Sequence, residues 1–375
     1  MISKFFLPTR VVFGTGVFKQ LQEYLTDLGG LCLIVYGRSS AQRSGLLDRA
    51  LQSLKQAGKR VELFGGVPPE PDVKIVNHAT MRVCKLKPDF VIGLGGGSVI
   101  DVAKAAAGLA REPNFTTVAD FLEGCGMRKL DVPGIPFVAI PTVAGTGAEV
   151  TKNSVIVKHD TREKRSLRSD LLFARFAIVD PETTVSVPAS ITAESGFDGL
   201  AHLIEGYVSR WATPLTDALA EYAISLMSRS LLKCVREPGN IQARSDVSLA
   251  ALIGGIMIAN SGLGIAHGIG SFLGGMFGVR HGVVCALLLP YVMKFNQSYA
   301  KQKFSQLDTI FGGNCVKAVR QMCRDTGIPQ RLRDIGIKEE NLSALAKASV
   351  TASSTKGNPR QVSELDVLKF LKSAL

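Results

Sequence analysis

The sequence lacks several features that would assign it to particular classes of protein. Its 375 residues contain no CxxC pair, no run of basic residues and no uninterrupted apolar stretch of about 18 residues, the length that a membrane span needs. The first residues, MISKFFLPTR, have too short an apolar run and no small-residue cleavage site for a secretory signal. We therefore expect a cytoplasmic protein with no membrane partner.

The cysteines give no sign of a disulfide framework or a zinc knuckle. They are odd in number and widely scattered. This pattern is typical of reduced thiols in a cytosol. The seven positions are Cys32, Cys84, Cys125, Cys234, Cys285, Cys315 and Cys323.

The net charge of +12 is not accompanied by the other marks of a nucleic-acid-binding protein. Lysines and arginines are dispersed, and aromatic residues are not interleaved with them. We therefore expect no nucleic-acid partner. A basic surface suits an anionic cofactor or substrate instead.

The first half of the chain alternates short β-branched runs with helical patterns. This alternation predicts βαβ units and a Rossmann-like parallel sheet. The segments VIVKHD and FAIVD (176–180) indicate an extended or antiparallel excursion. Strands are expected at 31–37, 61–66, 88–97 and 135–141, and helices at 45–58 and 73–86.

After Asp180-Pro181 the pattern changes. From about Ile191 nearly every segment has helical spacing, for example 215–235 and 248–261. A chain of this length with 46% hydrophobic residues can bury more than one core. We predict an α/β domain over 1–185 and an all-helical domain over 186–375.

Two glycine-rich loops follow predicted strands. Such loops let the backbone approach a pyrophosphate, and a following helix supplies N–H donors. One glycine turn alone is also typical of a tight turn without a ligand, but two at strand ends of one sheet indicate a dinucleotide site. The first loop consists of Gly95, Gly96, Gly97 and Ser98, before a helix expected to begin near Ile100. The second, 141–151, offers the hydroxyls of Thr142, Thr146 and Thr151.

The end of the first strand bears on which nicotinamide cofactor binds. NAD sites usually place an acid there for the ribose 2′-hydroxyl, whereas a 2′-phosphate needs cations or hydroxyls. No Asp or Glu is present here, and Arg43 is nearby, which favours NADP(H) over NAD(H). The alternative is that these arginines only solvate a surface loop. The residues concerned are Gly37, Arg38, Ser39 and Ser40.

Three of the five histidines occur in glycine-rich helical surroundings of the second half. Asp198 and His202 are four residues apart and share a helix face. His267 and His281 lie further along the chain. One carboxylate and three imidazoles suit Fe²⁺ or Zn²⁺ and leave a position for a substrate oxygen. His78 and His159 have no comparable setting, and we expect them at the surface.

Seven segments together resemble the iron-containing (group III) alcohol dehydrogenases. The similarity runs in order from about residue 8 to the C-terminus. The segments are GGGSxxDxAK (95–104), PTxAGTGxEVT (141–151), DPE (180–182), FDGLAHLIEGYVS (197–209), GLGIAHGIG (262–270), HGVVCALLLPYVMKFN (281–296) and GNPR (357–360).

The resemblance implies a dinucleotide-binding α/β domain and a helical metal-binding domain, with the active site in the cleft between them. It implies metal ligation by Asp198, His202, His267 and His281. Family members are commonly homodimers, and the N-terminal PTRVVFG strand resembles the element through which they pair. The implied pyrophosphate contacts are Gly96, Gly97, Ser98, Thr142 and Thr146, and the residues near ribose or nicotinamide are Thr151, Asn153 and Lys164.

The chain departs from the family pattern at two places. Val99 stands where many members have proline, which only pre-sets a helix start. Ser271 stands where many members have a histidine near the nicotinamide, so a titratable group of the family's site is missing. Proton exit is then expected through water, the cofactor ribose hydroxyls or Asp101.

The expected reaction is reversible hydride transfer between NADP(H) and a primary alcohol or aldehyde, with a metal as Lewis acid. His267, through the metal, and Asp101 are the expected catalytic residues. Three alternatives stay open. They are a dehydroquinate synthase-like lyase, which shares the overall plan, another superfamily oxidoreductase such as glycerol dehydrogenase, maleylacetate reductase or a polyol-phosphate dehydrogenase, and a catalytically silent NADP-binding protein.

Overall fold

The computed structural model describes residues 4–158 and 163–375, which form two compact units. The α/β unit comprises Leu7–Val143 and Gly147–Val187. The helical unit comprises Pro188–Leu375, the short segment Ala144–Thr146 and, at the start of the described chain, residues 4–6. The chain passes from one unit to the other between Val187 and Pro188.

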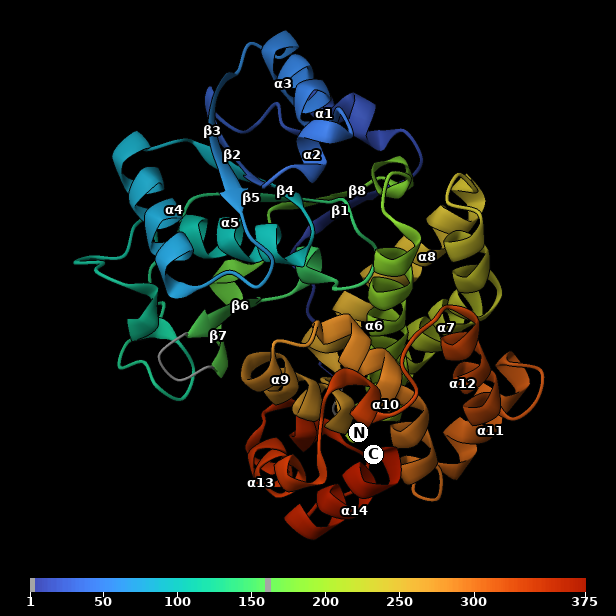
Figure 1. Cartoon of the computed structure of the whole chain (residues 1–375). Coiled ribbons are helices and arrows are strands. Elements are labelled where there is room, and N and C mark those ends of the chain that lie inside the picture. The colour runs from blue at the N-terminus through green and yellow to red at the C-terminus, as the bar shows by residue number, and fades with distance from the viewer. Residues whose placement is uncertain (1–3, 159–162) are drawn as a thin grey trace. The chain divides into compact units, whose positions relative to one another are not determined.

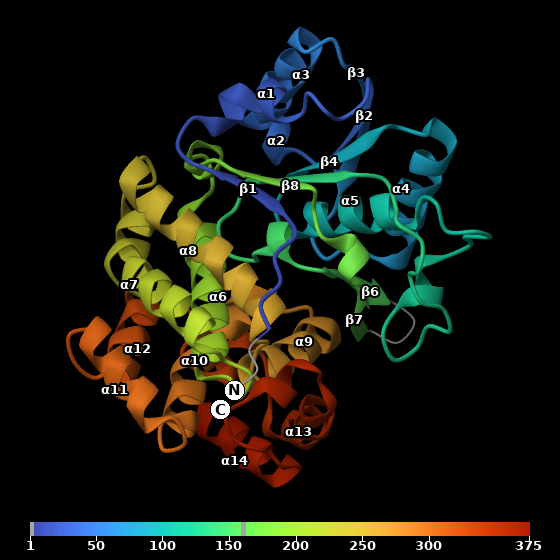
Figure 2. The same cartoon turned by 180° about the vertical axis from the view of Figure 1, so that it is seen from behind.

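The α/β unit is built on a six-stranded sheet with the order β1-β8-β5-β4-β2-β3 (Figures 1 and 2). Every neighbouring pair in this sheet is parallel. The central strand β4, FVIGLG, is buried throughout, as a strand covered on both faces must be. The strands are β1 Arg10–Phe13, β2 Leu31–Gly37, β3 Arg60–Val67, β4 Phe90–Gly95, β5 Phe137–Pro141 and β8 Phe176–Val179.

Helices cover both faces of this sheet. Alternate residues of a strand point to opposite faces, so Leu33 and Val35 join one apolar core while Cys32 and Ile34 join another. The first core is closed by α4 and α5, and the second by α1 and α3. The helices are α1 Leu21–Tyr24, α2 Ser40–Arg43, α3 Leu46–Gln56, α4 Val73–Leu86 and α5 Gly97–Leu109.

The predicted antiparallel excursion is correct for one segment and wrong for the other. β6 (Asn153–Lys158) and β7 (Glu163–Arg168) form an antiparallel hairpin outside the main sheet. In contrast, β8 lies in the main sheet, parallel to both β5 and β1. All four residues of β8 are apolar and buried, and the sheet interior requires that composition. His159 lies outside the described residues.

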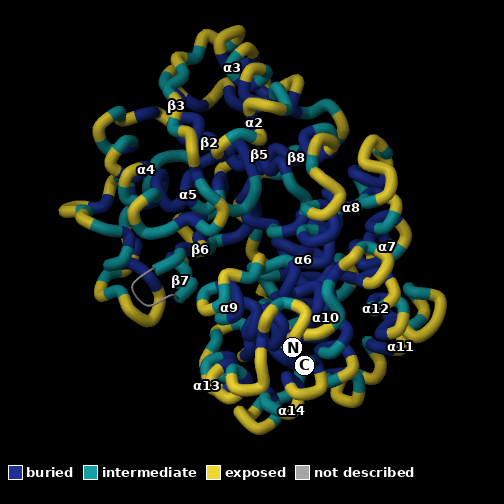
Figure 3. The backbone as a smooth tube through the Cα atoms, viewed as in Figure 1, coloured by how far each residue is buried: buried dark blue, intermediate teal, exposed yellow. Residues whose placement is uncertain are grey.

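The helical unit packs around one apolar core. Its helix α6 is buried along most of its length, as the dark tube in Figure 3 shows. The helices are α6 Ala189–Val208, α7 Pro214–Arg236, α8 Ile241–Asn260, α9 Ile265–Phe277, α10 His281–Asn296, α11 Lys301–Ile310, α12 Cys315–Asp325, α13 Leu342–Thr351 and α14 Glu364–Ala374. The predicted fold class, a parallel α/β unit followed by helices, is confirmed.

One helix among the described residues, α8, is long and apolar enough to cross a membrane. However, 67% of its most apolar window is buried inside the protein. It packs against α6 and α7, and its residues Ala250 and Met257 belong to the apolar core of the helical unit. The composition of α8 is therefore that of a core helix.

Candidate metal centre and cofactor edge

Helix α6 carries two of the predicted metal ligands on one face. Asp198 and His202 are separated by one helical turn and are both buried. His267 lies in the first turn of α9, and His281 is the first residue of α10. The structure therefore brings the four predicted side chains together from three helices.

The four ligand atoms converge on a common centre. Asp198 Oδ1 lies 3.4 Å from His267 Nε2, 3.7 Å from His281 Nε2 and 3.9 Å from His202 Nε2. Two nitrogen or oxygen ligands of a tetrahedral zinc ion are about 3.3 Å apart, given bond lengths of about 2.0–2.1 Å. The observed separations are close to that spacing and slightly wider.

Two of these atoms are buried without a hydrogen-bonding partner among the described residues. They are Asp198 Oδ1 and His267 Nε2. Unpartnered buried polar atoms are rare in folded proteins, because each has lost its hydrogen bonds to water. A divalent cation at the centre would satisfy both atoms, so the residues present fit such an ion.

The opposite ring nitrogens of two histidines are held by the protein. His267 Nδ1 lies 2.6 Å from Glu205 Oε2, and His202 Nδ1 lies 3.3 Å from the carbonyl oxygen of Gly145. When Nδ1 donates to these acceptors, the lone pair of Nε2 faces the centre, which is the tautomer that binds a metal.

Glu205 was missed by the sequence analysis. Its carboxylate also accepts the backbone N–H groups of Gly264 and Ala266, so it holds the start of α9 as well as the His267 ring. Its position, seven residues after Asp198, was the available signal because it places the carboxylate on the same face of α6. A carboxylate behind a metal-binding histidine raises its basicity and fixes its orientation.

Gly145 is required where the second glycine loop approaches α6. A Cβ at this position would lie 2.3 Å from the carbonyl oxygen of Ser195. Only glycine lets the loop backbone come close enough for its carbonyl to meet His202. This second support of the centre was also missed, because nothing in the sequence pairs the loop with His202.

Burial and charge set the protonation of Asp198 and His202, two of the four proposed ligands. Burial lowers the pKa of His202 to about 3 although Asp198 opposes the shift, so this imidazole is neutral and able to bind a metal. Burial alone would raise the pKa of Asp198, but the nearby histidines hold it well below its usual range. A carboxylate and a neutral imidazole are the forms that ligate divalent ions.

The serine that replaces the family's histidine is occupied locally. Ser271 Oγ donates to the carbonyl oxygen of His267, 2.9 Å away, one turn earlier in α9. A serine hydroxyl also does not titrate near neutral pH. The side chain therefore cannot act as a titrating acid or base in the way a histidine does.

The predicted cofactor segments follow three strands that are neighbours in the sheet. β5, β4 and β2 are adjacent and parallel, so the segments after Pro141, Gly95 and Gly37 leave the same edge. The chain also reverses its strand order between β2 and β4. Dinucleotides bind at the carboxyl ends of strands at such a switch point.

The first glycine loop leads directly into α5. Gly96 is the extended N-cap and Gly97 the first helical residue, three residues earlier than the predicted start near Ile100. The backbone amides of the first turn are the donors that an anion meets. Ser98 Oγ accepts the N–H of Glu70, 3.1 Å away.

Other predicted cofactor residues are placed as follows. Thr142 and Thr151 are buried, whereas Thr146 belongs to the segment that groups with the helical unit. Asn153 begins β6, and Lys164 in β7 forms a 2.5 Å ion pair with Glu70. Glu70 therefore contacts both predicted residues, Lys164 through its carboxylate and Ser98 through its backbone N–H.

Asp101 lies on the first turns of α5. Its Oδ2 accepts the N–H of Val155 at 3.1 Å, which ties the β6–β7 hairpin to the helix. Burial raises the pKa of Asp101 to about 6, although Lys104 opposes the shift. A carboxyl with this pKa exchanges a proton near neutral pH.

Lys104 is a further residue that the sequence analysis did not single out. Its ammonium group is buried and donates to the carbonyl oxygens of Ala148, Thr151 and Asn153 at 2.7–2.9 Å. The lysine thus fixes the end of the second glycine loop. A charged residue inside the alanine-rich sequence of α5 was the available signal, because such a residue is buried only with partners.

Two residues that follow β2 are accessible to solvent. Arg38 and Ser40 are exposed and Gly37 is buried. The described residues from Tyr36 to Ser44 contain no carboxylate. His78, on α4, is exposed as predicted.

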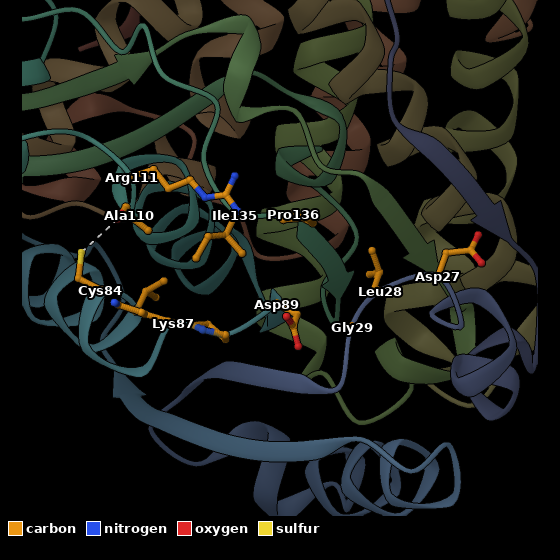
Figure 4. Close-up of a pocket in the computed structure, with 12 residues that line it drawn as sticks. Asp27, Leu28, Gly29, Cys84, Lys87, Asp89, Ala110, Arg111, Ile135 and Pro136 are labelled. Carbon is orange, nitrogen blue, oxygen red and sulfur yellow. Dashed lines mark hydrogen bonds between the residues drawn. The ribbon is translucent and has the colours of Figure 1, made fainter.

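A pocket of about 540 Å³ opens at the other edge of the same sheet (Figure 4). Its lining includes Gly29, Asp89 and Pro136, which precede β2, β4 and β5. Asp89 Oδ2 accepts the N–H of Leu31, and Cys84 Sγ donates to the carbonyl oxygen of Ala110. The pocket lies at the amino ends of the strands and contains none of the predicted site residues.

Comparisons with known proteins cover nearly the whole chain. The family model described as "Iron-containing alcohol dehydrogenase" matches residues 8–181, and "Fe-containing alcohol dehydrogenase family, C-terminal" matches residues 192–375. A long-chain-alcohol dehydrogenase from Geobacillus thermodenitrificans is 37% identical over 93% of this chain and 90% of its own length.

Relatives with either cofactor are found. An NAD-dependent methanol dehydrogenase from Bacillus methanolicus is 31% identical over the full length of both chains. An NADPH-dependent butanol dehydrogenase from Clostridium saccharobutylicum is 31% identical over 99% of this chain and 97% of its own. An alcohol dehydrogenase from Oenococcus oeni has a similar structure, with a TM-score of 0.94 and 30% identity over all of both chains. The chain therefore belongs to the iron-containing alcohol dehydrogenase family, whose members are oxidoreductases that act on alcohols or aldehydes.

Proposed function

We propose that this protein interconverts primary alcohols and aldehydes with NADP(H), using one divalent ion held by Asp198, His202, His267 and His281. The observation that carries the proposal is the convergence of one carboxylate oxygen and three imidazole Nε2 atoms on a buried centre. Fe²⁺ and Zn²⁺ both suit this ligand set.

The bound ion would supply Lewis-acid chemistry, polarising a carbonyl or stabilising an alkoxide. The chain's own residues do the rest. Glu205 holds His267 in the metal-binding tautomer, and Gly145 does the same for His202. Burial of Asp198 and His267 excludes water from the ligand atoms and strengthens their electrostatic interactions.

Cofactor binding is proposed at the carboxyl edge of the sheet. The first turn of α5 offers backbone amides to the pyrophosphate, with Gly95, Gly96, Gly97 and Ser98 allowing close approach. Thr142, Thr146, Thr151, Asn153 and Lys164 are proposed contacts of the remaining cofactor groups. Lys104 positions Thr151 and Asn153 through their backbone oxygens.

The NADP(H) preference rests on the segment after β2. Arg38 and Ser40 are exposed there, and no carboxylate is present to repel a 2′-phosphate. Asp101 is proposed to take part in proton exit, because its pKa of about 6 lets it change protonation near neutral pH.

We also propose a cytoplasmic homodimer. All seven cysteines are free thiols, which fits a reducing compartment. β1 is an edge strand of the sheet, and an edge strand offers unpaired backbone groups to a second copy. Light scattering on the purified protein tests this, and a monomer at micromolar concentration would contradict it.

A substrate panel tests the enzymatic proposal. Protein loaded separately with Fe²⁺ and with Zn²⁺ is assayed on primary alcohols and aldehydes with NADPH and with NADH. The proposal predicts turnover that needs a metal and has a higher kcat/KM with NADPH. Full activity after metal removal would contradict the metal role, and a far higher kcat/KM with NADH would contradict the cofactor preference.

A further inference from the structure

Cys285 is a buried thiol that the proposed hydride transfer does not use, yet it lies inside the metal-binding cluster. Its Sγ is 3.5 Å from His281 Nε2. The ligand atoms of Asp198, His267, His281 and Cys285 all lie within 4.8 Å of one another. His281 and Cys285 are four residues apart on α10 and so share one face of that helix.

The facing helix leaves room for this sulfur. Gly270 on α9 has no side chain, and a Cβ there would lie 3.3 Å from Cys285 Sγ and 3.2 Å from His281 Cε1. Contacts this short would require one of the two side chains to shift by a few tenths of an ångström. Glycine at this position therefore lets Cys285 and His281 face the centre together.

The sulfur has the spacing of a ligand. With bond lengths of about 2.3 Å to sulfur and about 2.0–2.1 Å to nitrogen, and an angle of roughly 109° at the ion, a sulfur and a nitrogen ligand are about 3.5 Å apart. The distance between Cys285 Sγ and His281 Nε2 matches that value. Independently of the cysteine, Asp198 Oδ1 and His267 Nε2 are buried there without a hydrogen-bonding partner among the described residues.

Other cysteines in the protein are partnered differently. Cys84 Sγ lies 3.4 Å from the carbonyl oxygen of Ala110, and Cys323 Sγ lies 3.5 Å from that of Ala286. These two thiols donate to backbone oxygens. Cys285 instead approaches a nitrogen that is itself a proposed ligand.

We propose that Cys285 is an additional metal ligand in the substrate-free enzyme, and that its thiolate makes the site prefer Zn²⁺ to harder divalent ions. The proposal rests on the proposed function, because it needs an ion at the same centre. Binding forms a bond between the sulfur lone pair and the ion, and the thiol proton leaves to solvent without any change of oxidation state. Soft thiolate ligands select zinc over ions such as Mn²⁺.

X-ray absorption at the zinc edge tests the proposal on the full chain loaded with one equivalent of Zn²⁺. The wild type should show sulfur at about 2.3 Å together with nitrogen or oxygen at about 2.0–2.1 Å. Cys285→Ser should lose the sulfur shell and keep the lighter one. Cys234→Ser is the matched control, since Cys234 is a buried thiol of the same core on α7, and it should keep both shells.

The outcomes separate this inference from the function on which it rests. Bound zinc with only nitrogen and oxygen neighbours in the wild type would overturn the role of Cys285 and leave the four-ligand site intact. Zinc that fails to bind, or that binds without imidazole scattering, would overturn both.

Metal competition gives a second readout that does not depend on the serine variant folding. Cys285→Ala should lower the affinity for Zn²⁺ relative to Mn²⁺, on the order of tenfold, because only the softer ion loses a favoured ligand. Cys234→Ala should leave the ratio unchanged. An unchanged ratio in Cys285→Ala would contradict the proposal.

Discussion

The two units of this protein present their proposed binding groups in different ways. The carboxyl edge of the α/β unit offers mainly backbone amides, made accessible by glycines and positioned by the order of parallel strands. The centre of the helical unit consists of side chains that meet from three helices and are held by Glu205 and Gly145. A substitution should therefore act locally and strongly at the metal centre, and more diffusely at the cofactor edge.

The largest effect is expected from His267→Ala, which removes a buried residue proposed as a metal ligand. The metal should be lost and turnover should fall by about a thousandfold or more, since Lewis-acid stabilisation is worth several kcal/mol. Metal analysis and steady-state kinetics measure this, and NADPH binding should persist. His78→Ala, at an exposed histidine of α4, is the control and should behave as wild type. Retained metal in His267→Ala would contradict the assignment of the centre.

Glu205→Gln tests the support of the centre without removing a ligand. We expect about 10- to 100-fold weaker metal binding, the usual result of altering the partner of a ligating histidine. Titration with a competing chelator measures it. The control is Glu221→Gln, which alters a glutamate bonded to Tyr207 in the same unit. Equal metal affinities in the two variants would show that Glu205 serves only to begin α9.

Lys104→Met should weaken cofactor binding at the carboxyl edge of the sheet and should not change metal binding. Three buried carbonyl oxygens lose their charged donor, so we expect about 3 kcal/mol less stability and weaker NADPH binding. Denaturation and fluorescence titration measure the two effects. Lys74→Met, at an exposed position of α4, is the control. A parallel loss of metal would show that the two sites are not separable in this way.

Glu149 should make the stability of the α/β unit depend on pH. Burial raises its pKa from 4.5 to about 7, so the folded state holds an extra proton between these values. The associated stability is present below pH 4.5 and is lost as the pH rises to about 7, on the order of 3 kcal/mol. Glu149→Gln should lack this loss and so gain stability relative to wild type over that range. Denaturation of both proteins across this pH range measures the effect. A stability difference between Glu149→Gln and wild type that does not vary with pH would refute the prediction.

The smallest effect is expected from Arg38→Ala. Loss of one exposed cation should lower kcat/KM for NADPH about tenfold and change that for NADH little, since a charge-assisted contact to phosphate is worth about 1–2 kcal/mol. Arg43→Ala distinguishes a specific contact from a general effect of positive charge. Equal losses with both cofactors would remove the basis for the NADP(H) preference.

Much of the secondary structure can be predicted from the sequence, because hydrophobic periodicity depends on local residue types. It predicts α4 at its observed bounds. It misplaces β8, because a four-residue strand has no periodicity long enough to show which sheet it joins. Strand order, which unites the three cofactor segments, depends on tertiary packing and is visible only in the structure.

For the candidate site, the sequence supplies residue types but few of the contacts between them. The four proposed ligands stand out as rare residues in suitable settings. Glu205, Lys104 and Cys285 resemble ordinary helical residues until the helices are packed. They can be recognised only from contacts with residues far away in the sequence and from the unpartnered buried atoms beside them, and both become visible only in the structure.

The central claim is that the helical unit binds one divalent ion through Asp198, His202, His267 and His281. Anomalous diffraction at the metal edge, on crystals of the loaded protein, tests it most directly. The account predicts one strong peak at about 2.0–2.3 Å from Asp198 Oδ1 and from the Nε2 atoms of the three histidines. A peak elsewhere, or none at this centre in protein that retains its metal, would contradict it.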